Sequence, residues 1–359
     1  RGCCLPERVP VPQLIATLPD RPLAVIGDVH GELAALERLL ARPALGPDRF
    51  LVFVGDLIDR GPDSPGVVRR VRELVDAGRA QVVLGNHELN LLIDRDREGN
   101  GWFKNREDLW QHRQDGGFVN VAFDSTPAGG PAERAAMLDF FASLPLAAEN
   151  DELRVVHACW HGPSLAALPA EGDVATLMME RDLAIQEELE EAGVVARAAV
   201  QRAAWAELKD RSLCPDRMLE DVAIQDMTEQ NGNPVAALTS GLEERIPFAD
   251  RFYIGGKWRF VERSRWWRDY TDPQAVVVGH YWRRLTHVGH GSRDVFQTAK
   301  PTDWAGPRRN VFCVDYSVGR RYRERAAGRT SGFDGVLGAV LWPERTLVFS
   351  DRPGQAPTR

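Results

Sequence analysis

The sequence is poor in cysteine, contains no long apolar run and has no excess of positive charge, and each absence excludes a class of protein. Only five of its 359 residues are cysteines. The number is odd and no two have a metal-finger spacing, which argues against a disulfide framework and for a reducing compartment. No apolar stretch approaches the roughly 20 residues that span a bilayer, and no signal peptide is visible. We therefore expect a cytoplasmic protein with no membrane partner.

Positive charge is in deficit, with 45 lysines and arginines against 52 acidic residues and a formal net charge of −7. Such a chain repels a phosphate backbone, which argues against binding a nucleic-acid duplex. A phosphorylated substrate remains compatible with it, because the charge of bound metal ions outweighs the net charge within a site. The composition leaves the oligomeric state open.

Short apolar runs alternate with helical patterns along the chain. In the first ninety residues we expect strands at 23–26, 50–54 and 81–84 and helices at 32–41 and 65–77. Further strands are expected at 153–156, 275–278 and 311–315, and a hairpin at 336–349. The initial β-α-β-α-β order predicts an α/β fold, with a parallel sheet flanked by helices.

Composition divides the chain into three kinds of segment. Residues 1–20 are rich in proline and are expected to be irregular. Residues 21–351 are interpreted as one folded domain. Within that domain, the stretch from about 163 to 240 is rich in Ala, Glu, Leu and Arg and has no strand pattern. We interpret it as a helical insertion that caps or borders a site.

Three short polar motifs follow the first three expected strands. They are GDVHG at 27–31, GDLIDRG at 55–61 and GNHE at 85–88. Sites in open α/β sheets form at the carboxyl ends of the strands, so the three motifs should lie side by side. Asp28, Asp56 and Asn86 are each separated by one βα unit, which supports this arrangement.

The residue types in these motifs suit a pair of divalent cations. Asp28 and His30 present two ligands from one tight turn. Asp56 can bridge two ions, because a carboxylate has two oxygens, and Asn86 offers a neutral oxygen to the second ion. Two ions about 3.5–4 Å apart can hold a phosphoryl group and deprotonate a shared water.

Two later histidines complete this ligand set. His157 follows the strand expected at 153–156, and His280 follows the strand expected at 275–278. Neutral imidazole is a common ligand for such ions. Nitrogen and oxygen ligands suit manganese, iron or zinc about equally, so the residues alone do not identify the two metals.

The motifs together resemble those of the calcineurin-like metallophosphoesterases, and within them the phosphoprotein phosphatase family. The run GDLIDRGPDSPGV at 55–67 is particularly similar to bacterial members, which include serine/threonine phosphatases and relatives that act on nucleotides. The resemblance is dense over 23–90 and does not reach the helical insertion. It implies a four-layer α/β/β/α sandwich for residues 21–351 and activity supported by two divalent ions, with manganese expected.

The resemblance also implies a role for each motif residue. The first metal would be held by Asp28, His30 and Asp56, and the second by Asp56, Asn86, His157 and His280. A bridging hydroxide would attack phosphorus. Arg60 would bind the phosphate through its guanidinium fork. His87 would be the general acid that protonates the leaving oxygen, held and polarised by Asp59.

A second cation on the phosphate is expected from the segment 255–267. Lys257, Arg259 and Arg263 are equal candidates. The tryptophans of the same segment either grip a base or a peptide or pack internally. Tyr281 either lines the site or packs against it. The arginines after Asp315, at 320, 321, 323 and 325, either attract an extended anion or lie in a solvated loop.

Two activities fit these motifs, and they differ in the leaving group. A phosphoserine or phosphothreonine protein phosphatase is favoured, because its poor alkoxide leaving group needs an acid and the Asp59–His87 pair supplies one. The alternative is a hydrolase of dinucleoside polyphosphates such as diadenosine tetraphosphate, whose phosphate leaving group departs more easily. A third reading, an inactive metal-binding scaffold, would predict a lost ligand or acid, and none is lost.

Overall fold

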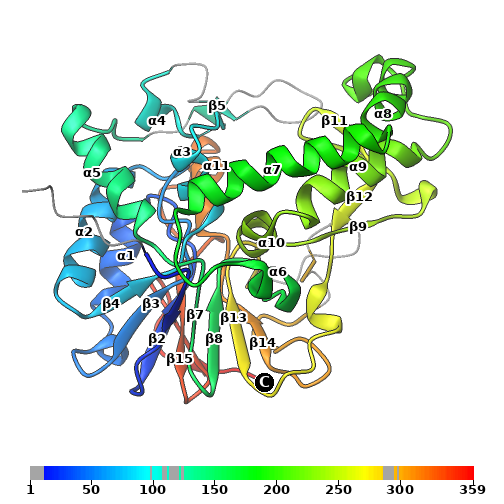
Figure 1. Ribbon diagram of the computed structural model, residues 1–359. Coiled ribbons are helices and arrows are strands. Elements are labelled where there is room, and N and C mark those ends of the chain that lie inside the picture. The colour runs from blue at the N-terminus through cyan, green and yellow to red at the C-terminus, as the bar shows by residue number, and fades with distance from the viewer. Residues whose placement is uncertain are drawn as a thin grey trace, which may run out of the picture.

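Two mixed β-sheets form the centre of the protein, as a computed structural model shows for residues 12–97, 99–106, 111–112, 121–122, 125–285, 295–296 and 299–359 (Figure 1). The first has the order β17 (Gln355–Pro357), β16 (Thr346–Phe349), β15 (Gly338–Trp342), β2 (Leu23–Ile26), β3 (Phe50–Phe53) and β4 (Ala80–Val82). The second has the order β1 (Ile15–Thr17), β7 (Ala147–Glu149), β8 (Leu153–Val156), β13 (Ala275–Val278) and β14 (Val311–Cys313). Strands β2, β3 and β4 run parallel, as do β8, β13 and β14.

Side chains of the central strands alternate between two cores. On β2, Leu23 and Val25 belong to the core between the sheets, which β8, β13 and β14 also supply. Their neighbours Ala24 and Ile26 join the core beneath the helices. Successive residues of a strand point to opposite faces, and both faces are covered here. The strands are therefore apolar throughout, which is why short apolar runs predicted them.

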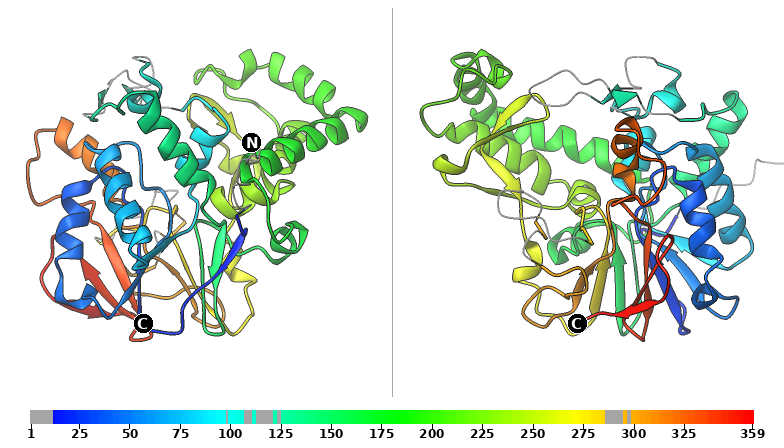
Figure 2. Two further views of the ribbon diagram at one scale, coloured as in Figure 1. Left: turned by 60° about the vertical axis from the view of Figure 1, so that its left-hand side comes forward. Right: turned by 180° about the vertical axis from the view of Figure 1, so that it is seen from behind.

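Helices α1 (Leu33–Leu40) and α2 (Ser64–Asp76) cover the outer face of the first sheet (Figure 2). Helix α2 begins at Ser64, one residue before the predicted start, because the Asp63 carboxylate accepts a hydrogen bond from the Gly66 amide at 2.8 Å. Its buried face contains Val67, Val71 and Leu74, at helical spacing. The α/β sandwich expected from the motifs is therefore confirmed.

Helices occupy most of the segment from 163 to 240. They are α6 (Gly162–Ala167), α7 (Val174–Glu191), α8 (Val194–Ala203), α9 (Glu220–Asn231) and α10 (Pro234–Ser240). Helix α7 lies across the carboxyl ends of the strands, with α8 and α9 beyond it (Figure 1). Two antiparallel pairs follow in sequence, β9 (Glu243–Arg245) with β12 (Val261–Arg263) and β10 (Phe252–Ile254) with β11 (Lys257–Arg259).

The boundaries and number of strands differ from the expectation in several places, among them the earlier ends of β3 and β14 and the unpredicted strands β7 and β9 to β12. Strand β4 ends at Val82, two residues before the predicted end. Strand β1 lies inside the segment 1–20 that was expected to be irregular, because it pairs with β7 in a register that joins Ile15 to Ala147. Strand β17 pairs with β16 near the carboxyl end. None of the described helices is long and apolar enough to span a bilayer.

Candidate active site

The three motifs and the two later histidines meet at the carboxyl edge of the two sheets. Asp28 and His30 follow β2, Asp56 follows β3, and Asn86 is the first residue of α3 (Asn86–Leu92). His157 directly follows β8 and His280 lies two residues after β13, both in the second sheet, and their ring centroids are 5.2 Å apart. The site therefore lies between the two sheets, because the carboxyl ends of the parallel strands of both sheets meet there.

Strained backbone and close approach hold these loops together. His30, Asp56 and His280 adopt φ values of 47°, 48° and 66°, in the left-handed region that non-glycine residues rarely enter. A β-carbon on Gly279 would lie 2.1 Å from Asp28 Oδ1, and one on Gly85 would lie 2.4 Å from Asp56 Oδ1. Only glycine allows the backbone to pass so close to the two carboxylates.

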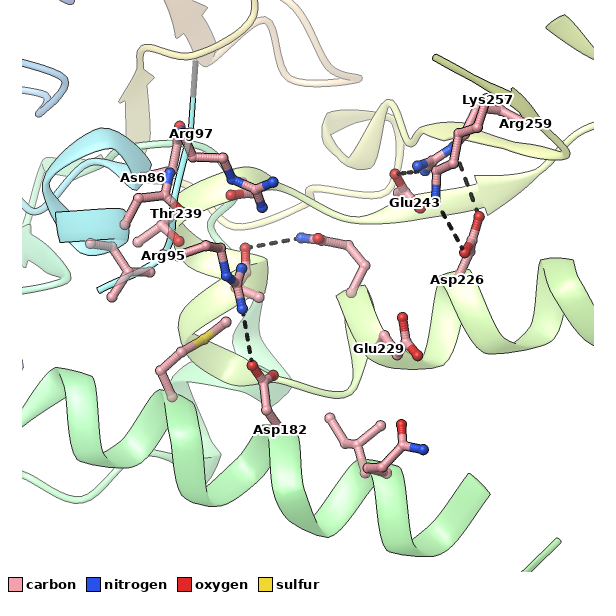
Figure 3. A pocket seen from close by; sticks show the side chains of 18 residues that line it. Asn86, Arg95, Arg97, Asp182, Asp226, Glu229, Thr239, Glu243, Lys257 and Arg259 are labelled. Atoms are coloured by element: carbon pink, nitrogen blue, oxygen red, sulfur yellow. Dashed lines mark hydrogen bonds and ion pairs between the residues drawn. The ribbon is translucent and has the colours of Figure 1, made fainter. Parts of the chain in front are cut away.

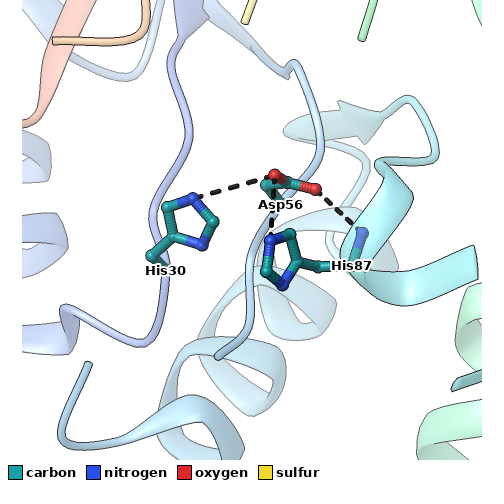
Figure 4. A group of neighbouring side chains, drawn as sticks. All are labelled: His30, Asp56 and His87. Carbon is teal, nitrogen blue, oxygen red and sulfur yellow. Dashed lines mark hydrogen bonds and ion pairs between the residues drawn. The ribbon is translucent and has the colours of Figure 1, made fainter. Parts of the chain in front are cut away.

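Two histidines, His30 and His87, face one oxygen of Asp56, where the first metal is predicted (Figure 4). His30 Nδ1 donates a hydrogen bond to the Ile58 carbonyl at 3.0 Å, which leaves Nε2 without a proton and able to bind a cation. That Nε2 lies 3.7 Å from Asp56 Oδ2 and 3.9 Å from Asp28 Oδ2. One ion could therefore bind Asp28, His30 and Asp56 together.

The second predicted group surrounds the other oxygen of Asp56. His157 Nδ1 donates to the Val54 carbonyl at 2.7 Å, and its Nε2 lies 3.4 Å from Asp56 Oδ1 and 3.2 Å from Asn86 Oδ1. His280 Nδ1 lies 2.9 Å from the same Asn86 oxygen. Ligand atoms of Asp56, His157 and His280 all lie within 4.8 Å of one another. This donor set fits a second cation, with Asp56 shared between the two.

Burial and charge tune the histidines differently. Burial, and then Arg60, hold the pKa of His30 well below its usual range. Burial, and then Arg263, do the same for His280. Both rings are thus neutral at neutral pH, the form that binds metals. Burial also opposes charge on His157, but Asp56, Asp28 and the Val54 carbonyl together outweigh burial and raise the pKa of His157 to about 10. A cation binding there has to displace a proton.

His87 and Asp59 form the predicted acid pair, and a tryptophan completes it. His87 Nδ1 lies 2.5 Å from Asp59 Oδ2, so the ring donates to the carboxylate and keeps Nε2 facing the site. Trp102 Nε1 donates to the other oxygen, Asp59 Oδ1, at 2.6 Å. Trp102 belongs to α4 (Gly101–Lys104) and is 1% exposed. No motif marks Trp102 in the sequence, because it contacts Asp59 from 43 residues away.

The Arg60 side chain lies between the rings of His30 and His87. Its guanidinium donates to His30 Nε2 at 2.9 Å and to His87 Nε2 at 3.1 Å. The Trp282 ring lies 5.3 Å from the guanidinium carbon, a cation–π contact that limits its movement. The Arg60 guanidinium thus lies between His30 and His87, beside the candidate metal ligands.

Glu88 is a buried carboxylate to which the sequence analysis assigned no role, although it ends the GNHE motif. It is 0% exposed, and its two oxygens accept hydrogen bonds from the amides of Gly85, Asp56, Leu57 and Ile58 at 3.2, 2.9, 2.8 and 3.3 Å. Burial, and then Asp56, raise the pKa of Glu88 to about 7. Glu88 therefore fixes the loop that carries the bridging aspartate.

Asp315 performs a similar task between β13 and β14. Its oxygens accept from the Ser317 amide at 2.7 Å and from the Trp282 amide at 2.9 Å. Burial raises its pKa despite these bonds. The carboxylate thus connects the loop after His280 to the loop after β14. The two bonded residues are 33 positions apart, so no local sequence pattern predicts the contact.

The three candidates for a second phosphate cation occupy different places. Arg263 lies near the metal ligands, with its guanidinium 6.0 Å from the Tyr281 ring and close enough to lower the pKa of His280. Lys257 and Arg259 lie farther away on β11, each within 4 Å of Asp226. Arg263 is therefore the candidate that the fold brings to the site.

The aromatic and basic residues of the later segment mostly have structural contacts. Trp267 is buried and stacks on Phe296 at 4.4 Å between ring centroids, and Trp266 packs against Tyr270 at 5.9 Å. Tyr281 is also buried and packs against Trp267. In α11 (Arg321–Ala326), Arg321 and Arg325 are ion-paired with Glu32, and Arg321 also with Asp351. These ion pairs favour a structural role for both arginines over attraction of an anion.

Comparisons with known proteins agree with this geometry. The family model described as calcineurin-like phosphoesterase matches residues 21–297. A symmetrical bis(5'-nucleosyl)-tetraphosphatase of Ralstonia nicotianae is 51% identical over 77 residues, which cover 21% of this chain and 26% of that relative. The chain thus spans about a quarter of the length of the curated relative it matches.

Two solved structures match most of the chain at low sequence identity. A proposed diadenosine tetraphosphatase covers 97% of this chain and 99% of its own, at 17% identity and a TM-score of 0.44. A cold-active protein-tyrosine phosphatase of a psychrophilic Shewanella covers 96% of this chain and 83% of its own, at 14% identity and a TM-score of 0.43. Likeness at this level does not distinguish one substrate from another.

Proposed function

Because this chain belongs to the calcineurin-like phosphoesterase family, we propose that it is a metal-dependent hydrolase that cleaves dinucleoside polyphosphates of the diadenosine tetraphosphate type. The supporting observation is the 77-residue stretch that is 51% identical to a symmetrical bis(5'-nucleosyl)-tetraphosphatase. The sequence analysis placed this activity second, behind protein dephosphorylation. The curated relatives support the opposite order, since they carry the tetraphosphatase name.

The proposal includes two divalent metal ions and the residues that would bind them. Asp28, His30 and Asp56 would hold one divalent ion, and Asp56, Asn86, His157 and His280 the other. When bound, the ions would supply Lewis-acid polarisation of the phosphoryl group and activation of the attacking water. Manganese is the proposed metal, with iron and zinc compatible with the same donors.

The remaining residues act on the phosphoryl group itself. Arg60 binds its oxygens through a planar guanidinium, and Arg263 near His280 adds a second positive charge. His87 directs Nε2 toward the leaving oxygen and delivers a proton to it. Asp59 holds the ring in this orientation, because its carboxylate accepts the Nδ1 hydrogen at 2.5 Å.

A second candidate, a phosphoserine or phosphothreonine protein phosphatase, has one observation in its favour. The Asp59–His87 pair is short and buried, and such an acid matters most when the leaving group is a poor one. A nucleoside diphosphate leaves more easily than an alkoxide. The size of the His87 contribution on each substrate therefore separates the two candidates.

The decisive experiment compares diadenosine tetraphosphate with a phosphothreonine peptide, using the purified chain and added manganese. We expect faster release of adenosine diphosphate than of peptide phosphate, and His87→Asn should keep much of its rate on the dinucleotide. His161→Asn is the matched control, since His161 bonds Ser164 and lies outside the ligand cluster. Preference for the peptide by orders of magnitude, with an inactive His87→Asn, would overturn the proposal in favour of the protein phosphatase.

A further inference from the structure

A cavity of about 610 Å³ lies between the metal ligands and the helices of the insertion (Figure 3). Asn86, whose oxygen faces His157 and His280, belongs to its lining. The remaining walls come from α3, α7, α9 and α10 and from strands β9 and β11. Its volume is that of an ordinary small-molecule site. A substrate held at the metal ligands can therefore extend into the cavity.

Two arginines line the cavity on the side of Asn86 (Figure 3). Arg95 is ion-paired with Asp182 at 3.4 Å. Among the residues that the structure describes, no hydrogen bond or ion pair satisfies the Arg97 guanidinium. Arg97 is exposed overall, but partial burial of its side chain, and then Arg95 beside it, lower the pKa of Arg97. A cation next to a like charge and without an anion favours an anionic ligand at this position.

The opposite side of the cavity differs in charge. Lys257 and Arg259 face Asp226 at 3.8 and 3.9 Å, and Arg259 also bonds Glu243 at 2.6 Å, so these cations are already matched (Figure 3). The exposed Glu229 carboxylate adds a further acceptor. Phosphate is disfavoured beside such acids, whereas hydroxyl and amino groups can donate to them. The cavity is thus suited to anions at one end and to neutral polar groups at the other.

Apolar side chains form the wall between the two ends. Met178 and Ile185 of α7 and Leu89 of α3 line the cavity and are each less than 5% exposed. Gln186 stands beside Ile185 and is half-buried. A flat heterocycle has apolar faces and polar edges, which matches an aliphatic wall bordered by carboxylates and amides.

We propose that this cavity holds one nucleoside of the substrate, with Arg97 and Arg95 contacting the phosphates that connect it to the metal ligands. The inference rests on the proposed function, since it assigns the dinucleotide a binding path. It also explains why the helices of the insertion lie over the strand ends, because they supply the wall against which the nucleoside binds. One wall comes from α7 and the other from α9.

The test compares two ligands that differ only in the nucleoside. Calorimetry on the manganese-loaded protein measures binding of adenosine 5′-(α,β-methylene)diphosphate and of methylenediphosphonate, whose P–C–P linkages resist hydrolysis. We expect the nucleotide to bind about tenfold tighter or more, since burying one base against apolar side chains is worth at least that much. Gln186→Trp fills the cavity and should bring the ratio of affinities close to one.

Matched variants control for folding and for charge. Leu183→Trp adds the same bulk to α7, but Leu183 is 62% exposed and lines no part of the cavity, so its affinity ratio should stay at the wild-type value. Arg97→Gln should weaken both ligands by about tenfold, because it removes a charge that contacts phosphate. Arg69→Gln, in an exposed ion pair with Glu133, should weaken neither.

Equal affinity of the wild type for the two ligands, or a nucleotide advantage that persists in Gln186→Trp, would overturn the inference. Turnover of diadenosine tetraphosphate by the same preparation reports separately on the proposed function. Turnover with equal affinities would mean that the function stands and the cavity assignment fails. A lost nucleotide advantage in Gln186→Trp without turnover would mean that the cavity binds nucleotides and the proposed reaction is wrong.

Discussion

The carboxylate of Asp59 accepts one hydrogen bond on each oxygen, and this symmetry makes a sharp prediction. His87 Nδ1 donates to Oδ2 at 2.5 Å and Trp102 Nε1 donates to Oδ1 at 2.6 Å. Asn at this position has one acceptor and one donor, so Asp59→Asn can satisfy only one of the two. The other side then brings two donors together in a site where Asp59 and Trp102 are each 1% exposed.

The cost of that conflict can be estimated from buried hydrogen bonds. An unsatisfied buried donor costs about 1–3 kcal/mol, and about 1.4 kcal/mol corresponds to a factor of ten in rate. If His87 is the general acid, loss of its carboxylate removes a further part of the 10²–10⁴ that such catalysis contributes. We expect Asp59→Asn to lower kcat on phenyl phosphate by about 100-fold or more.

Removing the competing donor should restore part of the rate. Trp102→Phe deletes the indole N–H, so in the double variant the Asn oxygen is free to accept from His87. We expect Trp102→Phe alone to cost less than about tenfold, and the double variant to be about tenfold faster than Asp59→Asn alone. Thermal unfolding of each variant checks that loss of indole packing has not unfolded the protein.

The assay is the steady-state rate on phenyl phosphate and on p-nitrophenyl phosphate, with manganese in excess. The better leaving group needs less help from an acid, so every loss should be smaller on p-nitrophenyl phosphate. A double variant no faster than Asp59→Asn would refute the competition between the two donors. Equal losses on the two substrates would refute the role of His87 as the acid.

Three further predictions follow from the same contacts. Asp56→Asn should reduce bound manganese from about two ions per chain to fewer than one, because Asp56 is common to both ligand groups; elemental analysis that still finds two ions would contradict this. Glu88→Gln should lower the free energy of unfolding in urea by about 3 kcal/mol, since two of four amides lose their acceptor; a change below about 1 kcal/mol would refute that role. His157, with its pKa raised to about 10, is protonated in the metal-free protein, so manganese affinity should rise about tenfold per pH unit from about pH 6 to pH 8; calorimetry showing a flat profile would exclude proton displacement.

Local signals in the sequence predicted most of the site. Asp28, His30, Asp56 and Asn86 stand in short motifs that directly follow apolar strands, and the structure brings their side chains together. Strand β2 and strands β8 and β13 have the predicted bounds, because strands covered on both faces are apolar throughout. Elements that depend on a distant partner were missed. Strand β1 is an example, since its pairing with β7 joins residues about 130 positions apart.

The residues that support the site were also missed, and for a related reason. Trp102 contacts Asp59 across 43 positions and Glu88 contacts Asp56 across 32, and neither distance corresponds to a helical or strand period. The choice among three candidate phosphate cations likewise depended on where β11 and β12 lie. Arg263 comes near His280, whereas Lys257 and Arg259 face Asp226 in the cavity.

The sequence by itself determined which polar side chains gather at the candidate site, because side chains that follow apolar strands in tight turns have local signatures. Only the tertiary structure decided which carboxylates and indoles hold those side chains in place, and where the insertion leaves a cavity beside them. These features depend on side chains that meet from distant parts of the chain. Packing of the two sheets and of the helices above them determines which of these side chains come into contact. That packing depends on the whole fold and not on any single segment.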